Sequence, residues 1–549
     1  MLKTYAYPKY DYRRPPELDG TGHARRPVIV VGAGPVGMAA AIDLAQHGVP
    51  VLLLDDDDTV SLGSRGVCYA KRTLEILDRL GVGEAVCRKG VSWDVGRTFF
   101  GEREVYRFNL RPQPDHKRPG MINLQQYYLE EMLVARCEAA GVEMRWKNKV
   151  TAVEPQADGA RLTVETPDGS YAIACDWLVA ADGARSPIRR MLGLDVEGKV
   201  FTDRFLIADV VMRADFPAER WFWFDPPFHP NKSVLLHKQA DNVWRIDFQL
   251  GWDADPEQEK KPERVVPRIE AMLGRERPFE LEWVSVYTFQ CRRMQRFRHG
   301  RCLFVGDAAH QVSPFGARGA NSGIQDADNL AWKLALVLDG RAPDRLLDTY
   351  SDERVAAADE NILNSTRSTD FITPKSSVSR TFRNAVLQLA GRHEFARKLI
   401  NSGRLSVPSV CTDSALNTPD ANTFTGDMVP GAPLDDAPVE SNAQPGWLLD
   451  HVGGRFELLV YAERAADVDA HTLLDLRTPI PVRPVLITAS AAGRSALPML
   501  HDVRGRFLER YDALPGSAWL VRPDQHIAAR WRRVEPASIR AALARASGH

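Results

Sequence analysis

The 549-residue sequence lacks the features that mark membrane, secreted and nucleic-acid-binding proteins. No apolar run approaches the ~18–20 residues that a membrane-spanning helix needs, and residues 1–26 lack the apolar core of a signal peptide. The formal net charge of -1, from 71 basic and 72 acidic residues, gives no general attraction to nucleic acid or to an anionic membrane. We therefore expect a cytoplasmic protein with no nucleic-acid or membrane partner.

Cysteine is also scarce and scattered. The seven cysteines form no C-x-x-C pair and do not cluster with histidines at zinc-like spacing. An odd number of cysteines in a chain with a large core also argues against a disulfide framework. We expect no metal site and a reducing compartment.

A nucleotide-binding fingerprint stands near the N-terminus. A predicted strand at 27–31 leads into Gly32, Gly34 and Gly37, spaced as G-x-G-x-x-G, and then into a predicted helix at 38–47. The first glycine permits a tight turn, the second lets the backbone approach a pyrophosphate, and the third lets the helix pack on the strand. Asp55 ends the next predicted strand, 51–54, where its carboxylate can accept hydrogen bonds from ribose hydroxyls. The pattern predicts FAD or NAD rather than a 2'-phosphorylated nucleotide.

Two further motifs favour FAD. The segment 175–187 holds Asp182-Gly183 after a predicted strand, and the segment 301–310 holds Gly306-Asp307 after another. A glycine-rich stretch then leads into a predicted helix at 324–338. With the N-terminal fingerprint, these motifs resemble those of the single-component FAD-dependent aromatic hydroxylases, the para-hydroxybenzoate and phenol hydroxylase group. The chain looks most similar to 3-(3-hydroxyphenyl)propionate hydroxylase-like members.

The resemblance implies a set of cofactor contacts. Asp307 matches the residue that holds the ribityl chain, and Pro314 matches the proline that faces the flavin where oxygen reacts. Arg65 and Gln126, with Gln125 as an alternative, fall where the family places side chains near the phosphates and the ribityl chain. The acids could instead be turn residues or helix caps, and Arg65 a surface charge. The full predicted cofactor set is Gly32, Gly34, Gly37, Asp55, Arg65, Gln126, Asp182, Gly306, Asp307, Pro314, Gly319, Ala320 and Asn321.

The segment 200–290 predicts an antiparallel sheet that would bind the substrate. Strand alternation places Trp221 and Trp223 on one face and Phe222 and Phe224 on the other, so one pair could wall an aromatic pocket while the other packs in a core. Phe315, beside Pro314, is a further candidate for substrate contact.

A second strand of this segment carries polar candidates. Arg245, Asp247 and Gln249 share one face, and Arg245 resembles the flavin-steering arginine of para-hydroxybenzoate hydroxylase. His237 and Gln239 fall where that enzyme holds the substrate carboxylate with a serine and an arginine. With that arginine absent, a simple benzoate is disfavoured, and a phenol, catechol, nitrophenol or longer hydroxyaryl acid is favoured. His237 or Asp247 could deprotonate a phenol, or either could be a structural polar group.

The predicted fold is α/β. A Rossmann-like FAD-binding domain of the para-hydroxybenzoate hydroxylase type spans 27–195 and 296–405, with the substrate sheet inserted at 196–295. A linker at 406–445 leads to a thioredoxin-like C-terminal domain at 446–549, which the resemblance suggests more weakly. No cysteine follows Cys411, so this domain cannot exchange dithiols, and packing or homodimer formation is the use that we expect.

The predicted function is hydroxylation of a phenolic compound, in aromatic catabolism. The resemblance implies that NADPH or NADH visits transiently as reductant, that O2 is the oxidant, and that oxygen transfer passes through a C4a-hydroperoxyflavin. Denitration or epoxidation by a related flavoenzyme, and flavin binding without turnover, remain alternatives.

Overall fold

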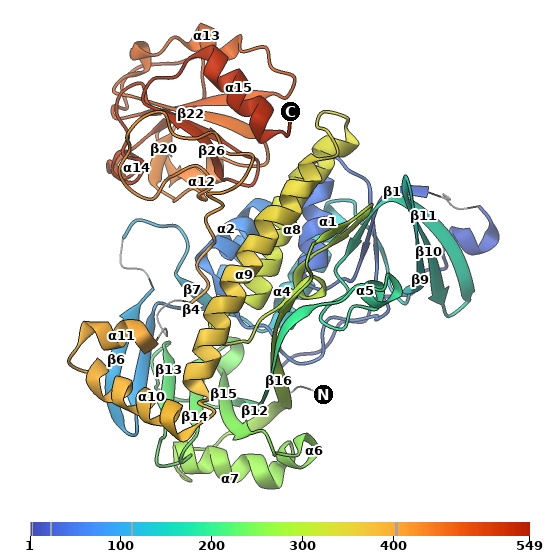
Figure 1. The fold of residues 1–549 in the computed structure, drawn as a ribbon, viewed down its shortest axis with the longest axis vertical. Coiled ribbons are helices and arrows are strands. Elements are labelled where there is room, and N and C mark those ends of the chain that lie inside the picture. The colour runs from blue at the N-terminus through green and yellow to red at the C-terminus, as the bar shows by residue number, and fades with distance from the viewer. Residues whose placement is uncertain (1, 3, 22–24, 111–113, 401–404) are drawn as a thin grey trace.

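The computed structural model describes residues 2, 4–21, 25–110, 114–400 and 405–549. Figure 1 shows three layered units around the long helices α8 (Gly319–Leu338) and α9 (Leu346–Ile372). One unit holds the N-terminal strand β1, and a second lies at the C-terminal end of α9. The C-terminal domain packs where α8 ends and α9 begins. No helix of the described residues is both long enough and apolar enough to cross a membrane.

The first unit is a largely parallel sheet. Its strands run in the order β17-β18-β11-β1-β2-β8, and β1 pairs in parallel with both β11 and β2. The long strand β11 also pairs with the antiparallel hairpin strand β10, which pairs with β9. The bounds are β1 Arg25–Val31, β2 Val51–Leu54, β8 Glu143–Arg145, β9 Lys149–Gln156, β10 Gly159–Thr166, β11 Gly169–Ala180, β17 Arg298–His299 and β18 Cys302–Phe304.

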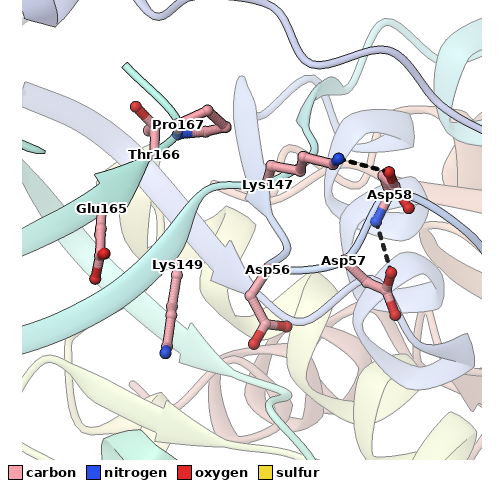
Figure 2. Close-up of a pocket in the computed structure, with 8 residues that line it drawn as sticks. All are labelled: Asp56, Asp57, Asp58, Lys147, Lys149, Glu165, Thr166 and Pro167. Atoms are coloured by element: carbon pink, nitrogen blue, oxygen red, sulfur yellow. Dashed lines mark hydrogen bonds and ion pairs between the residues drawn. The ribbon is translucent and has the colours of Figure 1, made fainter. Parts of the chain in front are cut away.

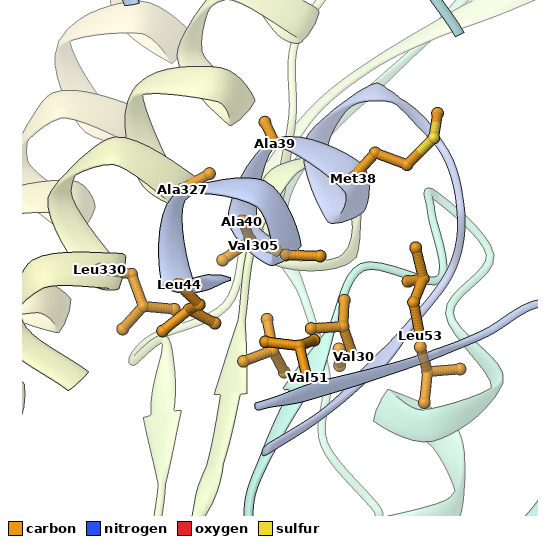
Figure 3. Close-up of a cluster of buried hydrophobic side chains, with 14 of the residues drawn as sticks. Val30, Met38, Ala39, Ala40, Leu44, Val51, Leu53, Val305, Ala327 and Leu330 are labelled. Atoms are coloured by element: carbon orange, nitrogen blue, oxygen red, sulfur yellow. The ribbon is translucent and has the colours of Figure 1, made fainter. Parts of the chain in front are cut away.

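The core of this sheet is apolar because parallel strands are covered on both faces. Helix α1 (Pro35–Gln46) packs between the sheet and α8, and Figure 3 shows Leu44 of α1 between Val51 of the sheet and Leu330 of α8. The other helices of this unit are α2 Lys71–Leu80, α3 Gly83–Lys89, α4 Gln126–Ala139 and α5 Pro187–Met191. A small sheet, β3-β7-β4, lies beside them, with β3 Cys68–Ala70, β4 Val91–Trp93 and β7 Met121–Asn123.

The second unit is an eight-stranded sheet in the order β19-β16-β12-β15-β14-β13-β5-β6. All of its pairs are antiparallel except β13 with β5. Two of its strands, β5 and β6, precede the rest by about a hundred residues in the chain. The bounds are β5 Val95–Phe100, β6 Arg103–Asn109, β12 Glu197–Val211, β13 Arg220–Phe224, β14 Ser233–Lys238, β15 Val243–Gly251, β16 Glu280–Arg293 and β19 His310–Gln311.

Helices cover the two faces of this sheet. Residues of α7 pack on one face with Trp244 and Phe248, while residues of α9, α10 and α11 pack on the other with Phe222 and Phe224. The bounds are α6 Pro256–Glu259, α7 Pro262–Leu273, α10 Ser377–Ala390 and α11 Glu394–Ile400. The face toward α9 is the one that meets the first unit, because Phe315 joins its aromatic cluster.

The C-terminal domain has a seven-stranded mixed sheet in the order β21-β20-β24-β23-β22-β25-β26. Parallel β22, β23 and β24 are flanked by the antiparallel pair β25 and β26, as a thioredoxin-like domain requires. The strands are β20 Pro438–Ser441, β21 Gln444–Trp447, β22 Phe456–Ala462, β23 Val482–Thr488, β24 Met499–His501, β25 Ala518–Val521 and β26 Ile527–Trp531. The helices are α12 Leu448–His451, α13 Ala470–Leu474, α14 Arg506–Tyr511 and α15 Pro536–Ala546.

Candidate active site

The three fingerprint glycines lie in the turn between β1 and α1, and each meets a different constraint. Gly32 has a φ of 109°, and a Cβ there would lie 2.4 Å from the carbonyl oxygen of Ala181. A Cβ on Gly37 would lie 1.9 Å from the carbonyl oxygen of Gly32. A Cβ on Gly34 would meet no atom of the described residues within 4 Å. Gly32 and Gly37 are therefore required by the backbone itself, whereas Gly34 faces an open space.

Asp55 closes this turn from the end of β2. Its Oδ2 accepts a hydrogen bond from the backbone N–H of Ala33 at 2.5 Å, and its Oδ1 accepts one from Asp57 at 2.9 Å. Burial raises the pKa of the carboxyl to about 6. Asp55 thus shapes the glycine turn, and each of its oxygens keeps a lone pair for a ribose hydroxyl.

Asp182 serves the local fold. Its Oδ2 accepts from the N–H of Ile188 at 2.9 Å, in the first turn of α5, while Ser186 caps the same helix through Arg189. Its Oδ1 is buried without a partner in the described residues, and burial raises the pKa of the carboxyl. The helix-cap interpretation of Asp182 is therefore what the structure shows, and a contact with a cofactor stays a prediction.

Asp307 lies at the turn after β18, where Gly306 adopts a φ of 59°. Protein surrounds its carboxyl closely enough that burial raises its pKa, although Arg65 and His310 lower it. Its side chain is nevertheless exposed and has no partner among the described residues. The carboxylate therefore borders an interior space, and Arg65, also exposed, lies near enough to affect its charge.

Helix α8 begins at Gly319, five residues before the start that the sequence predicts, and its first turn points toward Asp307. A Cβ on Gly319 would lie 3.9 Å from Asp307 Oδ1. No described side chain caps this end, so the N–H groups of Gly319 and Ala320 have no helical partner. A helix N-terminus of this kind stabilises negative charge. Pro314 is exposed in the loop that leads to it.

Two predicted cofactor residues hold backbone in place, and their contact with a cofactor stays a prediction. Gln126 accepts from the N–H of Gly66 at 2.9 Å and donates to Glu130 at 2.8 Å, which fastens the loop that carries Arg65. Asn321 accepts from the N–H of Ala70 at 2.8 Å and donates to backbone carbonyl groups, which ties α8 to β3. The alternative Gln125 is buried, and its amide donates to the carbonyl of Ala240 at 3.0 Å.

Arg245 is paired on the substrate sheet. It donates to both oxygens of Asp209, at 2.8 and 2.7 Å, and to the backbone carbonyl of Ser64. The Gln239 amide also donates to Asp209, at 3.2 Å. Arg245 and Gln239 thus form one buried group with Asp209, and this group joins the sheet to the loop before Arg65.

The aromatic residues of β13 alternate as predicted. Phe222 and Phe224 lie on the face toward Phe315, which contacts the rings of Phe205 and Phe289 at 5.0 and 5.1 Å between centroids. We call Phe205, Phe222, Phe289 and Phe315 the aromatic wall. Trp223 lies on the opposite face, where its ring stacks on Phe99 at 5.2 Å. The structure therefore does not bring Trp223 together with the other candidate substrate residues.

His237 is held by a chain of hydrogen bonds that sets its tautomer. The Trp93 indole can only donate, and it donates to Asn123 Oδ1 at 2.8 Å. Asn123 Nδ2 therefore lies on the other side, where it reaches the carbonyl of Lys238 at 2.8 Å and His237 Nδ1 at 3.2 Å. Nδ1 must accept, so the proton resides on Nε2, which is buried without a partner in the described residues. Burial, with Arg245 and Arg220 nearby, lowers the pKa of His237 well below its ordinary value.

Asp247 lies on the same face of the sheet. Its Oδ1 is buried without a described partner, and burial raises the pKa of the carboxyl to about 7. Tyr287 is close enough for Asp247 to raise its pKa further, beyond the effect of burial. A carboxyl with this pKa can change protonation state near neutral pH, as a general base must.

Arg220, at the start of β13, is the residue that the sequence prediction missed. It pairs with His237 in the sheet register, so the two side chains share a face. Its side chain is 9% exposed and forms no hydrogen bond or ion pair with any described residue. The sequence prediction considered only the position that Gln239 occupies, and the structure places another arginine, Arg220, on the face of His237. The available signal was alternation, which places Arg220 on the face of Phe222 and Phe224.

The open hollow in Figure 2 lies outside this site. It is lined by acids and lysines around Asp58, which pairs with Lys147 at 2.8 Å, and it contains none of the predicted site residues. No group of three or more potential metal ligands occurs among the described residues.

The residues from the glycine turn to the start of α8 fit FAD. The open space at Gly34 leaves room for a pyrophosphate, the free Asp307 carboxylate can hold ribityl hydroxyls, and the first turn of α8 can receive the pyrimidine edge of a flavin. Phe315 of the aromatic wall lies only four residues before Gly319 in the chain, so the wall adjoins the start of α8.

Comparisons with known proteins agree with this geometry. Residues 25–365 match a family described as FAD binding domain. The 6-methylpretetramide 4-monooxygenase of Streptomyces rimosus is 30% identical over 565 aligned positions, covering 96% of this chain and 94% of that protein. A 3-(3-hydroxy-phenyl)propionate/3-hydroxycinnamic acid hydroxylase of Mycolicibacterium smegmatis is 30% identical, but the match covers 60% of this chain and 58% of that protein.

A solved structure shows the same fold. The flavin-dependent monooxygenase PieE, crystallised with FAD and substrate, superposes with a TM-score of 0.80 at 24% identity and covers 95% of this chain and 99% of that one. The predicted α/β fold class is confirmed.

Proposed function

The chain belongs to the FAD binding domain family and is an FAD-dependent monooxygenase of the aromatic hydroxylase type, and from this premise we propose that it uses NAD(P)H and O2 to hydroxylate a phenolic compound. The substrate would bind on the face of the second sheet that carries the aromatic wall. Asp247 and His237 would contact its oxygen atoms.

One observation carries this proposal. The short loop 314–319 belongs to both halves of the site, since Phe315 packs in the aromatic wall and Gly319 lies beside Asp307. Pro314 is exposed at the start of this loop. A ring seated against Phe315 would therefore lie close to a flavin seated against Gly319, as transfer of one oxygen atom requires.

FAD, when bound, would accept a hydride from NAD(P)H and, once reduced, would activate O2. The protein then has three tasks, which are to exclude water, to orient the ring and to manage the phenol proton. The side chains of the aromatic wall are almost entirely buried, so a substrate ring seated among them would be shielded from water. Asp247 would take the phenol proton, because an ionised carboxyl is an acceptor and a phenolate is a stronger nucleophile than a phenol.

His237 would act as a hydrogen-bond donor rather than as a base. Its Nδ1 is already occupied by Asn123, and its Nε2 carries the proton. This division of roles follows from the hydrogen-bond chain that begins at Trp93.

A substrate screen tests the proposal. Phenols, catechols, nitrophenols and hydroxyaryl acids would be added to the FAD-loaded protein, with NADH and NADPH each as reductant. We expect at least one compound to stimulate NAD(P)H and O2 consumption and to yield a hydroxylated product. Asp307→Ala should lose FAD about 10- to 150-fold more readily, whereas the exposed Asp339→Ala should not. Unchanged FAD affinity in Asp307→Ala would remove Asp307 from the site.

A further inference from the structure

Arg220 and His237 are neighbours across β13 and β14, and both are buried on the face of the aromatic wall. Arg245 follows His237 in the next strand, but Asp209 neutralises it. Arg220 forms no ion pair with any described residue, although Asp247 lies near enough to attract its charge. The N–H groups of this buried guanidinium therefore have no hydrogen-bond partner among the described residues.

The imidazole of His237, which neighbours Arg220, presents a hydrogen-bond donor rather than an acceptor. His237 offers its Nε2–H, because Asn123 occupies Nδ1. The Arg220 guanidinium lies 5.7 Å from the ring centroid of Phe222, which supports it without pairing its N–H groups. A buried guanidinium and a buried imidazole N–H are both costly to leave unsatisfied, so their joint occurrence points to a ligand that accepts from both.

We propose that Arg220 and the Nε2–H of His237 form an anion-binding subsite, which holds an anionic oxygen group of the aromatic substrate while its ring lies against Phe222. This assignment rests on the proposed function for the identity of the ligand as a substrate. Arg220, from β13, would supply the positive charge for the substrate anion that the neutral Gln239, just after β14, cannot supply.

The N–H donors of Arg220 and His237 suit a ligand with a negatively charged oxygen atom. A guanidinium presents a planar fork of N–H groups that matches a carboxylate, and the imidazole N–H supplies one further donor. The ionised hydroxyl of a phenol or enol offers the same negative oxygen at a single point. Asp247, on the same face, would disfavour a second negative group at its own position, so the anion belongs at the Arg220 end of the pocket.

Binding to the oxidised, FAD-loaded protein tests this without turnover, because ligands near a flavin perturb its absorbance. In the first arm, benzoate, 3-phenylpropionate and 2-naphthoate are each compared with the neutral primary amide of the same acid. In the second arm, 4-nitrophenol reports its own ionisation by its visible absorbance. The variants are Arg220→Met, Arg220→Lys and the control Arg213→Met, whose side chain is exposed. Retained FAD shows that each variant is folded.

If a carboxylate is the natural group, at least one acid binds about 10-fold or more tightly than its amide, Arg220→Met loses this preference, and Arg220→Lys keeps part of it. If an ionised hydroxyl is the natural group, the acids gain nothing, but bound 4-nitrophenol ionises at lower pH, and Arg220→Met abolishes that shift. Arg213→Met behaves as the wild type in both arms.

The subsite is refuted if neither arm shows a preference for the anion, or if the preference persists in Arg220→Met. Failure of the proposed function looks different, since it would leave these binding differences intact while no phenol is hydroxylated.

Discussion

Asn123 Nδ2 lies 3.2 Å from His237 Nδ1, and this contact determines which nitrogen of the imidazole carries the proton. The amide cannot be reversed, because its oxygen receives the Trp93 indole N–H. The histidine that the sequence offers as a base is thus held as a neutral donor.

We expect His237 to stay neutral and protonated on Nε2 at neutral pH and at a pH equal to its ordinary pKa of about 6.5, because burial, Arg245 and Arg220 all lower its pKa. Nitrogen NMR of the imidazoles would show this, with His237→Gln used to assign the signal. Asn123→Asp should reverse the arrangement, since a carboxylate accepts from Nδ1–H and favours the charged ring. A signal that titrates near pH 6.5 in the wild type would contradict the tautomer.

The raised pKa of the Asp247 carboxyl should set the pH dependence of hydroxylation. Burial raises the pKa of its carboxyl to about 7, and only the ionised form can accept the phenol proton, so hydroxylation should slow as the pH falls below about 7. Asp247→Asn should slow hydroxylation and remove this dependence while flavin reduction continues. Stopped-flow kinetics of the two half-reactions would separate the effects, with the exposed Asp253→Asn as control. Equal slowing of both half-reactions in Asp247→Asn would point to a damaged pocket instead.

Gly34 and Gly37 form a matched pair of substitutions. Alanine at Gly34 meets no described atom within 4 Å, so the fold should tolerate it, but its methyl group would occupy the space for the pyrophosphate. Alanine at Gly37 would clash with the carbonyl oxygen of Gly32 and should destabilise the domain by about 1–3 kcal/mol. Thermal unfolding and FAD titration distinguish the two. If Gly34→Ala bound FAD normally, the pyrophosphate would have to lie elsewhere.

A buried ionic network joins the C-terminal domain to α9. Arg522 donates to Glu353 at 2.7 and 3.0 Å and to Asp524 at 2.5 Å, and Lys333 donates to Glu353 at 2.8 Å. Arg522→Met would leave buried carboxylates short of a counter-charge and should cost about 3–5 kcal/mol of unfolding free energy. The exposed Arg533→Met is the control, measured by denaturant unfolding.

The same network predicts a loss of stability in acid. Burial alone would raise the pKa of Glu353, but Arg522 and Lys333 outweigh it and hold the pKa well below the ordinary value. A carboxyl whose pKa is lowered on folding stabilises the protein above its unfolded pKa, about 4.3, and that contribution is lost as the pH falls below it. An acid transition that Arg522→Met leaves unchanged would show that other groups control it.

The sequence predicted those features that depend on residues close together in the chain. The strand 51–54 has the predicted bounds, because its apolar run and the flanking turns define it. The glycine turn followed from its spacing. What local pattern could not show was the long-range pairing, such as β5 and β6 joining β13, or Gln126 and Asn321 turning toward backbone atoms far away in the chain.

The substrate face shows the same limit. Alternation along β13 separated the Phe and Trp residues, but it could not tell which face meets Phe315, since that depends on how the two sheets pack. Arg220 was missed because the role proposed for it depends on His237 being its partner across the sheet and on its forming no ion pair with a described residue.

The most direct test of the account is to react the reduced, FAD-loaded protein with isotopically labelled O2 in the presence of each phenol that stimulates NAD(P)H oxidation. The account predicts a product that contains one labelled oxygen atom on a ring carbon. Release of hydrogen peroxide alone, with every phenol recovered unchanged, would contradict it.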